Sequence, residues 1–332
     1  MNDRGILIIS LDFELYWGVR DKRSLASCRD RISGGRAAIP RILSLFEQYE
    51  IHATWAAVGL LCFSGRRELR AGLPDLRPAY KNQNLSPYNH IANIGADEAE
   101  DPWHYGASLI QKIRATPGQE IGTHTFSHYY CLEEGQNGAM FRADLEAARH
   151  AARLAGVEPV SMVFPRNQYR AGYLDLCRDA GIRAYRGNEE SPMYQASDNR
   201  SYKCMLPRVL RFVDSYINFS GDHVWFPEQL AVGPPFNVPA SRFLRPWSPG
   251  LRFLEPLKLA RIRKSMETGA RQGGLYHLWW HPHNFGRHTD RNLDALEGVL
   301  MHFNRMKQRF GMLSMTMAEA AGYLQEHRSH AG

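Results

Sequence analysis

The strongest constraint on the fold is a run of apolar residues near the amino terminus. Residues Ile6–Leu11 read ILIISL, without alternation between apolar and polar side chains. A strand with one face in water alternates, whereas a strand of a parallel sheet is covered on both faces and is apolar throughout. The run therefore predicts a buried parallel strand, and the same chain must supply helices that cover the sheet.

Helical and strand-like segments then alternate along most of the chain. Residues 36–49, after Gly34-Gly35, have apolar residues at helical spacing, and Pro40 is expected in the first turn because a later proline disrupts a helix. Further strands are predicted at 53–58, 120–123, 160–164, 182–185 and 274–280, and further helices at 107–115, 140–154, 173–180, 257–267 and 292–310.

Roughly seven β/α units favour an α/β fold that is closer to a barrel than to an open sheet. Two stretches, about 63–105 and 187–250, lack periodicity, and we predict that they are irregular insertions. The whole chain, 1–332, is expected to form a single domain of this type.

Composition narrows the class of protein. The 332 residues include 41 basic and 34 acidic side chains, a net charge of +7, but no basic run resembles a nucleic-acid-binding arm, so no nucleic-acid partner is predicted. Five widely spaced cysteines form no Cys-x-x-Cys pair, which predicts reduced structural thiols. The first residues lack the long apolar stretch of a signal peptide, and no transmembrane run of ~18 apolar residues occurs, so the expected location is the cytoplasm.

Two carboxylates follow the first predicted strand directly. Asp12 and Glu14 are separated by one residue, so both side chains point the same way on an extended backbone. In parallel α/β folds, ligands bind at this end of the strands. Two like charges there need a cation or an arginine between them. The alternative is structural, with one loop acid and one helix N-cap.

His124 and His128 lie in GTHTFSH, after another strand-like piece. If this loop turns into a helix, residues i and i+4 face the same way and both imidazoles can bind one metal ion. Asp12 or Glu14 can supply the third ligand of a catalytic zinc site, which keeps one position open for water. The alternative is two histidines whose hydrogen bonds are satisfied in the core or at the surface.

Two further polar clusters follow predicted strands. His281 and His283 in LWWHPHN lie at a strand mouth, where a histidine suits proton transfer near neutral pH, unless it is buried and bonded to the backbone. Arg166 in VFPRNQYR can lie beside the acidic pair and keep a carboxylate ionised, or it can be an exposed, solvated arginine. The neighbouring candidates for hydrogen bonds to a sugar are Asn167, Gln168 and Tyr169.

All four clusters share one feature, because each directly follows an apolar strand. A barrel gathers the carboxyl ends of its strands on one face, so the clusters are expected to meet there. The expected groups are two histidines and a carboxylate that bind a metal ion, a second carboxylate as base, a histidine as acid and an arginine. Such a set hydrolyses an amide or ester with metal-bound water. The sequence therefore predicts a metal-dependent hydrolase.

These motifs resemble those of the polysaccharide deacetylase family, the NodB-like enzymes of carbohydrate esterase family 4. The series SLDFE, ATWAAVG, EIGTHTFSH, FPRNQY and LWWHPHN has the order and spacing of the family motifs from Ile6 to about Phe285. The resemblance implies a distorted (β/α)7 barrel with long loop insertions. It also implies metal-dependent N- or O-deacetylation of sugars.

The resemblance assigns roles to the residues of the first two motifs. His124 and His128 match the family's metal ligands. The family's usual Thr-Phe-Asp-Asp reads Ser-Leu-Asp-Phe-Glu here, which makes Asp12 the general base and Glu14 the third metal ligand. The two roles can be exchanged, because both carboxylates can reach the site.

The resemblance also assigns roles in the later motifs. Arg166 matches the residue that holds the base, although it stands one place away from the family's usual position. His281 matches the general acid. Two histidines follow the last strand where the family has one, so His283 is either a substrate contact or the replacement acid.

The predicted substrate is an acylated amino sugar on a nucleotide or lipid carrier, a precursor of a surface polysaccharide. The predicted substrate contacts are His283, Asn167, Gln168, Trp17 and Trp280. The predicted metal ion is Zn2+, with Co2+, Ni2+ or Fe2+ as alternatives, because two histidines and a carboxylate accept all of them. The alternative functions are a different metal amidohydrolase, such as a deformylase or an allantoinase-like enzyme, and a non-catalytic carbohydrate-binding relative.

Overall fold

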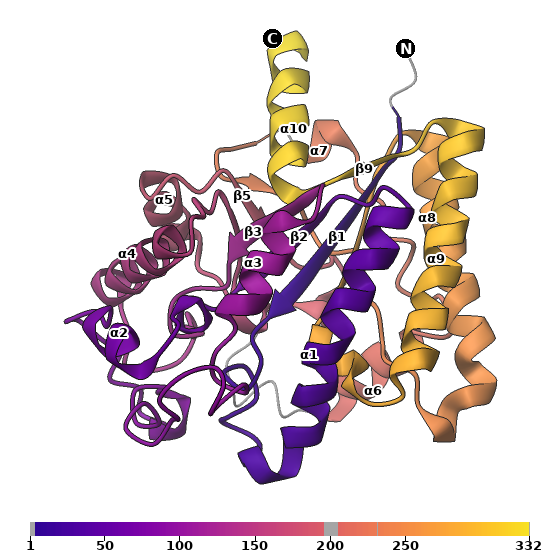
Figure 1. The fold of residues 1–332 in the computed structure, drawn as a ribbon. Helices are drawn as coiled ribbons and strands as arrows, with labels where there is room; N and C mark the ends of the chain where they lie inside the picture. Colours follow the sequence, from indigo (N-terminus) through magenta and orange to yellow (C-terminus); the bar gives the residue numbers. More distant parts are fainter. Residues whose placement is uncertain (1–3, 196–204, 231, 332) are drawn as a thin grey trace.

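A computed structural model describes residues 4–195, 205–230 and 232–331 of the chain. Within these residues, nine strands form one sheet whose paired neighbours run parallel, and helices surround it (Figure 1). The strands are β1 (Ile6–Phe13), β2 (Ala53–Ala57), β3 (Gln119–Thr123), β4 (Ser161–Val163), β5 (Ala184–Arg186), β6 (Phe236–Asn237), β7 (Arg242–Phe243), β8 (Leu275–Trp280) and β9 (Leu313–Met315). The α-helices are α1 (Leu25–Gln48), α2 (Arg66–Ala71), α3 (Ala107–Ala115), α4 (Gly138–Leu154), α5 (Ala171–Asp179), α6 (Met205–Asp214), α7 (Pro227–Leu230), α8 (Glu255–Gln272), α9 (Thr289–Phe310) and α10 (Met317–Ala331).

Strand β1 lies at the centre of the sheet, and all of its residues are buried. It pairs with β2 on one side and β8 on the other, and its first residues also pair with β9. Ile6 and Ile8 pack inside the curled sheet, against side chains of β4, β5 and β8. Leu7 and Ile9 point the opposite way and pack against the surrounding helices. This two-sided burial explains the uninterrupted apolar run.

The sheet closes through one extended segment. Its strand order is β6-β5-β4-β3-β2-β1-β8-β7, so β6 and β7 are consecutive in the chain but lie at opposite ends of the order. The N–H of Val238 donates to the carbonyl of Tyr185 in β5, and the N–H of Ser241 donates to the carbonyl of His277 in β8. The β6–β7 segment therefore acts as one bent strand between β5 and β8. This confirms the distorted (β/α)7 barrel that the motifs implied.

Helix α10 covers the amino-terminal end of the barrel. Met317 and Leu324 of this helix are buried in the same apolar cluster as Ile6 and Ile8. Figure 1 shows α10 beside the start of β1, whereas α6 lies at the other end of the barrel. Apolar side chains thus fill the amino-terminal end and leave the carboxyl ends of the strands for a polar site.

The predicted start of the first helix is wrong. Helix α1 begins at Leu25 and continues through Gly34, Gly35 and Pro40, although the glycines were expected before the helix and the proline in its first turn. The glycines serve another purpose, because a Cβ at residue 35 would lie 2.6 Å from the Cα of His283. The loop after β8 therefore packs directly on the helix backbone. This tertiary packing outweighs the hydrogen bond that Pro40 cannot donate.

The second predicted insertion is only partly irregular. The range 187–250 contains α6, α7 and the β6–β7 segment that closes the barrel. Each of those strands is two residues long, too short for a recognisable alternation of apolar and polar residues. The first insertion, 63–105, holds α2 and one short 3-10 turn between long irregular stretches.

The described cysteines are all buried. Cys28, Cys62, Cys131 and Cys177 are buried and free of disulfide bonds, whereas Cys204 lies outside the described residues. No helix in the described part of the chain has both the length and the apolar content that crossing a bilayer requires.

The packing of α1 on the loop after β8 predicts that Gly35→Ala destabilises the protein. The added methyl group would meet the backbone of His283, and we expect the free energy of unfolding to fall by about 1–3 kcal/mol, measured by denaturant titration. Gly322→Ala in α10 is the matched control, because a Cβ there meets no atom within 4 Å. It should be neutral or slightly stabilising. Equal unfolding midpoints for Gly35→Ala and the parent would contradict the close approach.

Candidate active site

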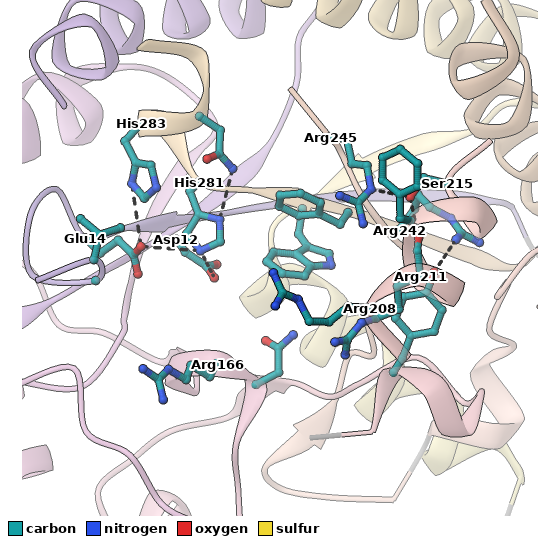
Figure 2. A pocket seen from close by; sticks show the side chains of 18 of the residues that line it. Asp12, Glu14, Arg166, Arg208, Arg211, Ser215, Arg242, Arg245, His281 and His283 are labelled. Carbon is teal, nitrogen blue, oxygen red and sulfur yellow. Dashed lines mark hydrogen bonds and ion pairs between the residues drawn. The ribbon is translucent and has the colours of Figure 1, made fainter. Parts of the chain in front are cut away.

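The carboxyl ends of the barrel strands open into a cavity of about 740 Å3. Asp12, Glu14, His128, His281 and His283 all line it. Residues from the loops after β1, β3 and β8 therefore meet, as the sequence predicted. Figure 2 shows the two acids beside the two histidines that follow β8.

Glu14, His124 and His128 form a candidate metal centre. Each offers one ligand atom, these atoms lie within 4.8 Å of one another, and all three residues are buried. Nε2 of His128 lies 3.1 Å and Nε2 of His124 lies 3.6 Å from Oε2 of Glu14. Two ligands at ~2.1 Å from one tetrahedral zinc ion are about 3.4 Å apart. The spacing of these atoms therefore fits ligands that share one ion.

The protonation states of these residues also suit a metal ion. Nδ1 of His124 lies 2.8 Å from the carbonyl oxygen of Val163, which can only accept, so Nδ1 carries a proton and Nε2 is the ring nitrogen that faces Glu14. Burial lowers the pKa of His128 to about 4, so this imidazole is neutral at pH 7. Burial opposes ionisation of Glu14, but the imidazoles of His281, His124 and His128 hold its pKa well below the ordinary value. Neutral imidazole and ionised carboxylate are the metal-binding forms.

A loop, rather than the helical turn that the spacing suggested, brings His124 and His128 together. The buried carboxylate of Asp144 in α4 accepts hydrogen bonds from the N–H groups of Phe126 and Ser127, at 2.7 and 3.2 Å. It also accepts one from the Ser127 hydroxyl. These bonds fix the loop while His128 has a φ of 57°, in the left-handed region that side chains disfavour. Asp144 is thus a supporting residue that the sequence analysis missed.

Arg186 at the end of β5 holds the second carboxylate, Asp12. Its Nη1 and Nη2 donate to the two carboxylate oxygens at 2.7 and 2.9 Å, and both residues are buried. This bidentate pairing fixes the plane of the carboxylate. Burial by itself raises the pKa of Asp12, but Arg186 and the imidazoles of His124 and His281 together hold it below the ordinary value. Asp12 is therefore ionised.

Hydrogen bonds inside the barrel fix Arg186 in turn. Its Nη1 donates to the hydroxyl oxygen of Ser10 at 2.9 Å. Nδ1 of His277 lies 3.0 Å from the carbonyl oxygen of Val238, so Nδ1 donates and Nε2 accepts from the Ser10 hydroxyl at 2.8 Å. Burial lowers the pKa of His277 to about 3, which keeps it neutral. The ring of Trp279 covers the guanidinium at 4.2 Å.

Arg166 does not take the position that the sequence predicted for it. Its guanidinium pairs with Asp21 and lies 3.7 Å from Glu133, because a left-handed φ of 56° turns this residue toward those acids. The following residue, Asn167, lines the cavity, and its Oδ1 accepts a hydrogen bond from Arg186 at 2.9 Å. Asn167 therefore supports the residue that replaces Arg166.

The two histidines after β8 differ in the acids that they contact and in their exposure to the cavity. Nε2 of His281 lies 3.7 Å from Oδ2 of Asp12 and 3.6 Å from Oε1 of Glu14. Its side chain is 24% exposed toward the cavity. His283 is buried, and its Nδ1 lies 3.8 Å from Oε1 of Glu14. His281 thus contacts both acids and remains open to a bound molecule.

Three predicted substrate contacts do not line the cavity. Trp17 is fully buried, and its indole N–H donates to the carbonyl of His104 at 2.8 Å. Trp280 lies in the core between the barrel and the helices, and Gln168 is fully buried. Trp279 lines the cavity instead of Trp280, because consecutive residues of a strand point to opposite faces.

Comparison with known families agrees with this geometry. Residues 18–185, about half of the chain, match the family described as polysaccharide deacetylase. The chain belongs to the polysaccharide deacetylase family. It is thus a hydrolase of a family that acts on acylated carbohydrates. No curated protein sequence matches the chain.

Solved structures show how widely this polysaccharide deacetylase fold is shared. A Mycobacterium smegmatis protein assigned as a polysaccharide deacetylase superposes with a TM-score of 0.60 at 15% identity, over 98% of this chain and 92% of that one. A Pseudomonas aeruginosa PAO1 protein with the same assignment gives 0.54 at 15% identity, over 99% and 93%. PuuE allantoinase gives 0.55 at 14% identity, over 96% and 89%. At these identities the likeness shows the fold.

The contact between Gly18 and Glu14 predicts that Gly18→Ala impairs the candidate metal centre. A Cβ at residue 18 would lie 1.9 Å from Cδ of Glu14, so the carboxylate must move. We expect zinc affinity to fall by at least about tenfold, measured by titration against a competing chelator. Gly172→Ala, whose Cβ would meet no atom within 4 Å, is the control. Parent-like affinity in a folded Gly18→Ala protein would argue against Glu14 as a ligand.

The pairing of Arg186 with Asp12 predicts a large loss of stability in Arg186→Met. The variant leaves a buried carboxylate without its cation, which costs about 3–5 kcal/mol of unfolding free energy. Adding Asp12→Asn should recover part of this loss. Arg178→Met is the control, because the Arg178–Asp175 pair is exposed and is worth about 1 kcal/mol or less. Equal losses in the single and double variants would mean that the ion pair is not the cause.

Proposed function

We propose that this protein removes an N-acetyl or related acyl group from an amino sugar in a metal-dependent reaction. The observation that carries the proposal is the meeting of two constellations in one cavity. One is the Glu14, His124 and His128 cluster, and the other is the Asp12 carboxylate held by Arg186. A metal-binding cluster beside an ionised carboxylate and a histidine is the arrangement that amide hydrolysis needs.

Glu14, His124 and His128 would hold the metal ion. Their donor atoms, spacing and protonation states fit Zn2+, and Co2+, Ni2+ or Fe2+ are the alternatives. When bound, such an ion polarises the acyl carbonyl and lowers the pKa of the water that attacks it. Glu14 touches both metal-binding imidazoles, whereas Asp12 is paired with Arg186. This difference favours Glu14 as the ligand and Asp12 as the base over the exchanged roles.

Asp12 would take a proton from the attacking water, and His281 would give one to the leaving amine. Arg186 keeps Asp12 ionised and oriented, so the carboxylate is ready to accept a proton. His281 lies between the carboxylates and the open cavity, which suits transfer to a leaving group. His283 is buried beside Glu14 and would position the acyl group or the ring.

The substrate would be an amino sugar on a phosphate-bearing carrier, either a nucleotide or a lipid, made in the cytoplasm for a surface polysaccharide. The cavity volume is in the range of sites that hold a whole small ligand. Trp279 and Asn167 in the cavity wall could stack on and hydrogen-bond to the sugar. Figure 2 shows Arg208, Arg211 and Arg245 at the end away from Asp12 and Glu14, where positive charge would favour a phosphate.

The proposal predicts acetate release from N-acetyl amino sugars on nucleotide or lipid carriers. Turnover should disappear after chelation and return with Zn2+. Asp12→Asn and His128→Ala should each lower kcat/KM by at least about a hundredfold, whereas His150→Ala, at an exposed position of α4, should not change it.

Release of formate, or opening of an allantoin ring in place of deacetylation, would show a different amidohydrolase. Binding of metal and sugar without turnover would show a non-catalytic relative. Full activity in both variants would remove the assigned roles.

A further inference from the structure

Helix α6 and the residues directly after it expose a group of large apolar side chains. Of the twelve such side chains exposed in the described part of the chain, six lie between residues 206 and 219. They are Leu206, Val209, Leu210, Val213, Ile217 and Phe219, which we call the α6 face. Leu206 keeps 65% and Ile217 keeps 60% of its surface exposed. Scattered exposed leucines are ordinary, whereas a contiguous group marks a binding surface.

The helix lies between most of this apolar surface and the cavity, and Val209, at the edge of the α6 face, also lines the cavity. Leu206, Leu210 and Val213 follow one another at i, i+4 and i+7, so they lie on the same side of the helix. Arg208 and Arg211 lie on the other side and line the cavity (Figure 2). One short helix therefore carries both the wall of the cavity and the outward apolar surface.

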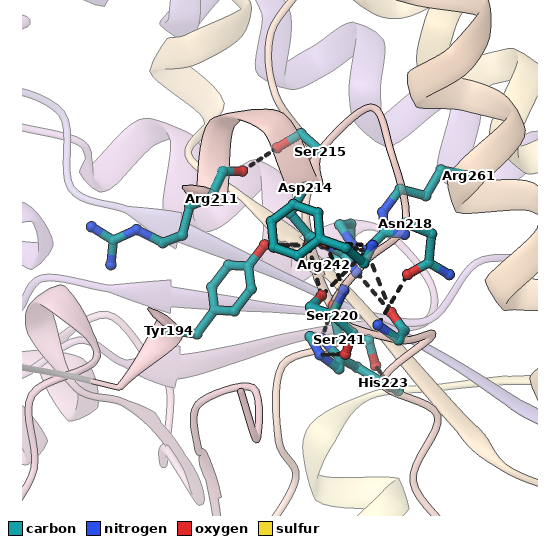
Figure 3. A network of polar contacts seen from close by, with 12 residues as sticks. Tyr194, Arg211, Asp214, Ser215, Asn218, Ser220, His223, Ser241, Arg242 and Arg261 are labelled. Atoms are coloured by element: carbon teal, nitrogen blue, oxygen red, sulfur yellow. Dashed lines mark hydrogen bonds and ion pairs between the residues drawn. The ribbon is translucent and has the colours of Figure 1, made fainter. Parts of the chain in front are cut away.

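The end of α6 is fixed to the barrel by Asp214. This fully buried carboxylate accepts hydrogen bonds from Arg242 and Arg261, which come from β7 and α8 (Figure 3). It also accepts one from the Tyr194 hydroxyl and one from the Ser220 hydroxyl, each at 2.7 Å. Burial opposes ionisation, but Arg242 and its other donors hold the pKa of Asp214 well below the ordinary value. These hydrogen bonds and ion pairs of Asp214 fix the orientation of α6, so its leucines cannot rotate into the core.

The charge around the α6 face is positive. Between residues 206 and 219 the one acidic residue is Asp214, which is buried and paired, whereas Arg208 is exposed. Exposed Phe253, in the turn directly before α8, and exposed Leu257 in α8 add apolar surface, with exposed Arg252 beside them. Glu255, between these two apolar residues, is largely buried and paired with Lys258.

Hydrogen bonds connect this part of α8 to the end of α6. Lys258 donates to the carbonyl oxygen of Arg245 at 2.8 Å, and Arg245 donates to the hydroxyl of Ser215 at 2.6 Å. Ser215 directly follows α6. The apolar residues at the start of α8 therefore belong to the same end of the barrel as the α6 face.

We propose that the α6 face docks on the surface of an anionic lipid bilayer. An apolar helix face with arginines beside it has the chemistry of an interfacial helix, and its positive charge attracts anionic headgroups. A second copy of the chain fits less well, because two-fold contact would bring like charges together without an exposed acid on this face. Docking places the arginine-lined end of the cavity at the headgroups. In this position the cavity would receive a lipid-linked substrate directly from the bilayer. This delivery rests on the proposed function, whereas docking does not.

The test is vesicle flotation with the full chain. We expect the protein to float with vesicles that contain phosphatidylglycerol and much less with pure phosphatidylcholine. Leu206→Ser/Leu210→Ser should weaken binding at least about tenfold without changing the thermal unfolding midpoint. Leu76→Ser/Leu154→Ser removes two exposed leucines elsewhere, at 44% and 52% exposure, and should bind like the parent.

Hydrogen exchange gives a second readout that needs no variant. Vesicles should slow exchange of the backbone amides of residues 205–219 more than those of the rest of the chain. Three outcomes would overturn the proposal: no binding by the parent, undiminished binding by Leu206→Ser/Leu210→Ser, or protection that falls elsewhere. A dimer that this variant breaks, in a chain that ignores vesicles, would assign the face to a second copy instead. Flotation measures binding and needs no turnover. Absence of flotation would therefore not contradict the proposed hydrolysis, and absence of hydrolysis would not contradict docking.

Discussion

The buried pairing of Arg186 with Asp12 is the interaction on which the rest of the site depends. It places a fixed negative charge where the barrel interior changes from apolar to polar. Below it, Ile6 and Ile8 pack against α10, and above it the cavity opens. Burial alone would favour a neutral Asp12, and the Arg186 guanidinium, with the imidazoles of His124 and His281, keeps the carboxylate ionised. Ser10, in the barrel interior, accepts a hydrogen bond from Arg186 and so helps to fix the guanidinium.

Loops with unusual backbone angles present the other reactive groups. Of the eight non-glycine residues with positive φ in the described ranges, five follow β1, β3 or β4: Leu15, Thr125, His128, Arg166 and Asn167. Such angles persist where surrounding contacts over-determine them, and they concentrate at functional sites. Here the contacts include the hydrogen bonds from the histidine loop to Asp144. A sharply turned loop can direct two imidazoles at one carboxylate without a helical turn. A regular helix would need no such backbone angles.

The segment that closes the barrel also builds the far wall of the cavity. β7 supplies Arg242, and Arg245 follows two residues after the strand ends. Through Asp214, Arg242 also ties α6 to the barrel. Barrel closure, the arginine-lined end of the cavity and the outward apolar face of α6 thus depend on one stretch of chain.

The sequence by itself determined which strand ends carry the chemistry. Asp12, Glu14 and His281 could be assigned to the site because an apolar run and the point where it ends are local features of the sequence. The tertiary structure decided which side chains face inward and which partners they meet. Arg186 directly follows a predicted strand and could have been found by the same rule, but its choice over Arg166 depends on the neighbouring strands and on a left-handed turn. Likewise a one-residue difference in strand phase puts Trp279, not Trp280, in the cavity, because only packing against the helices fixes that phase.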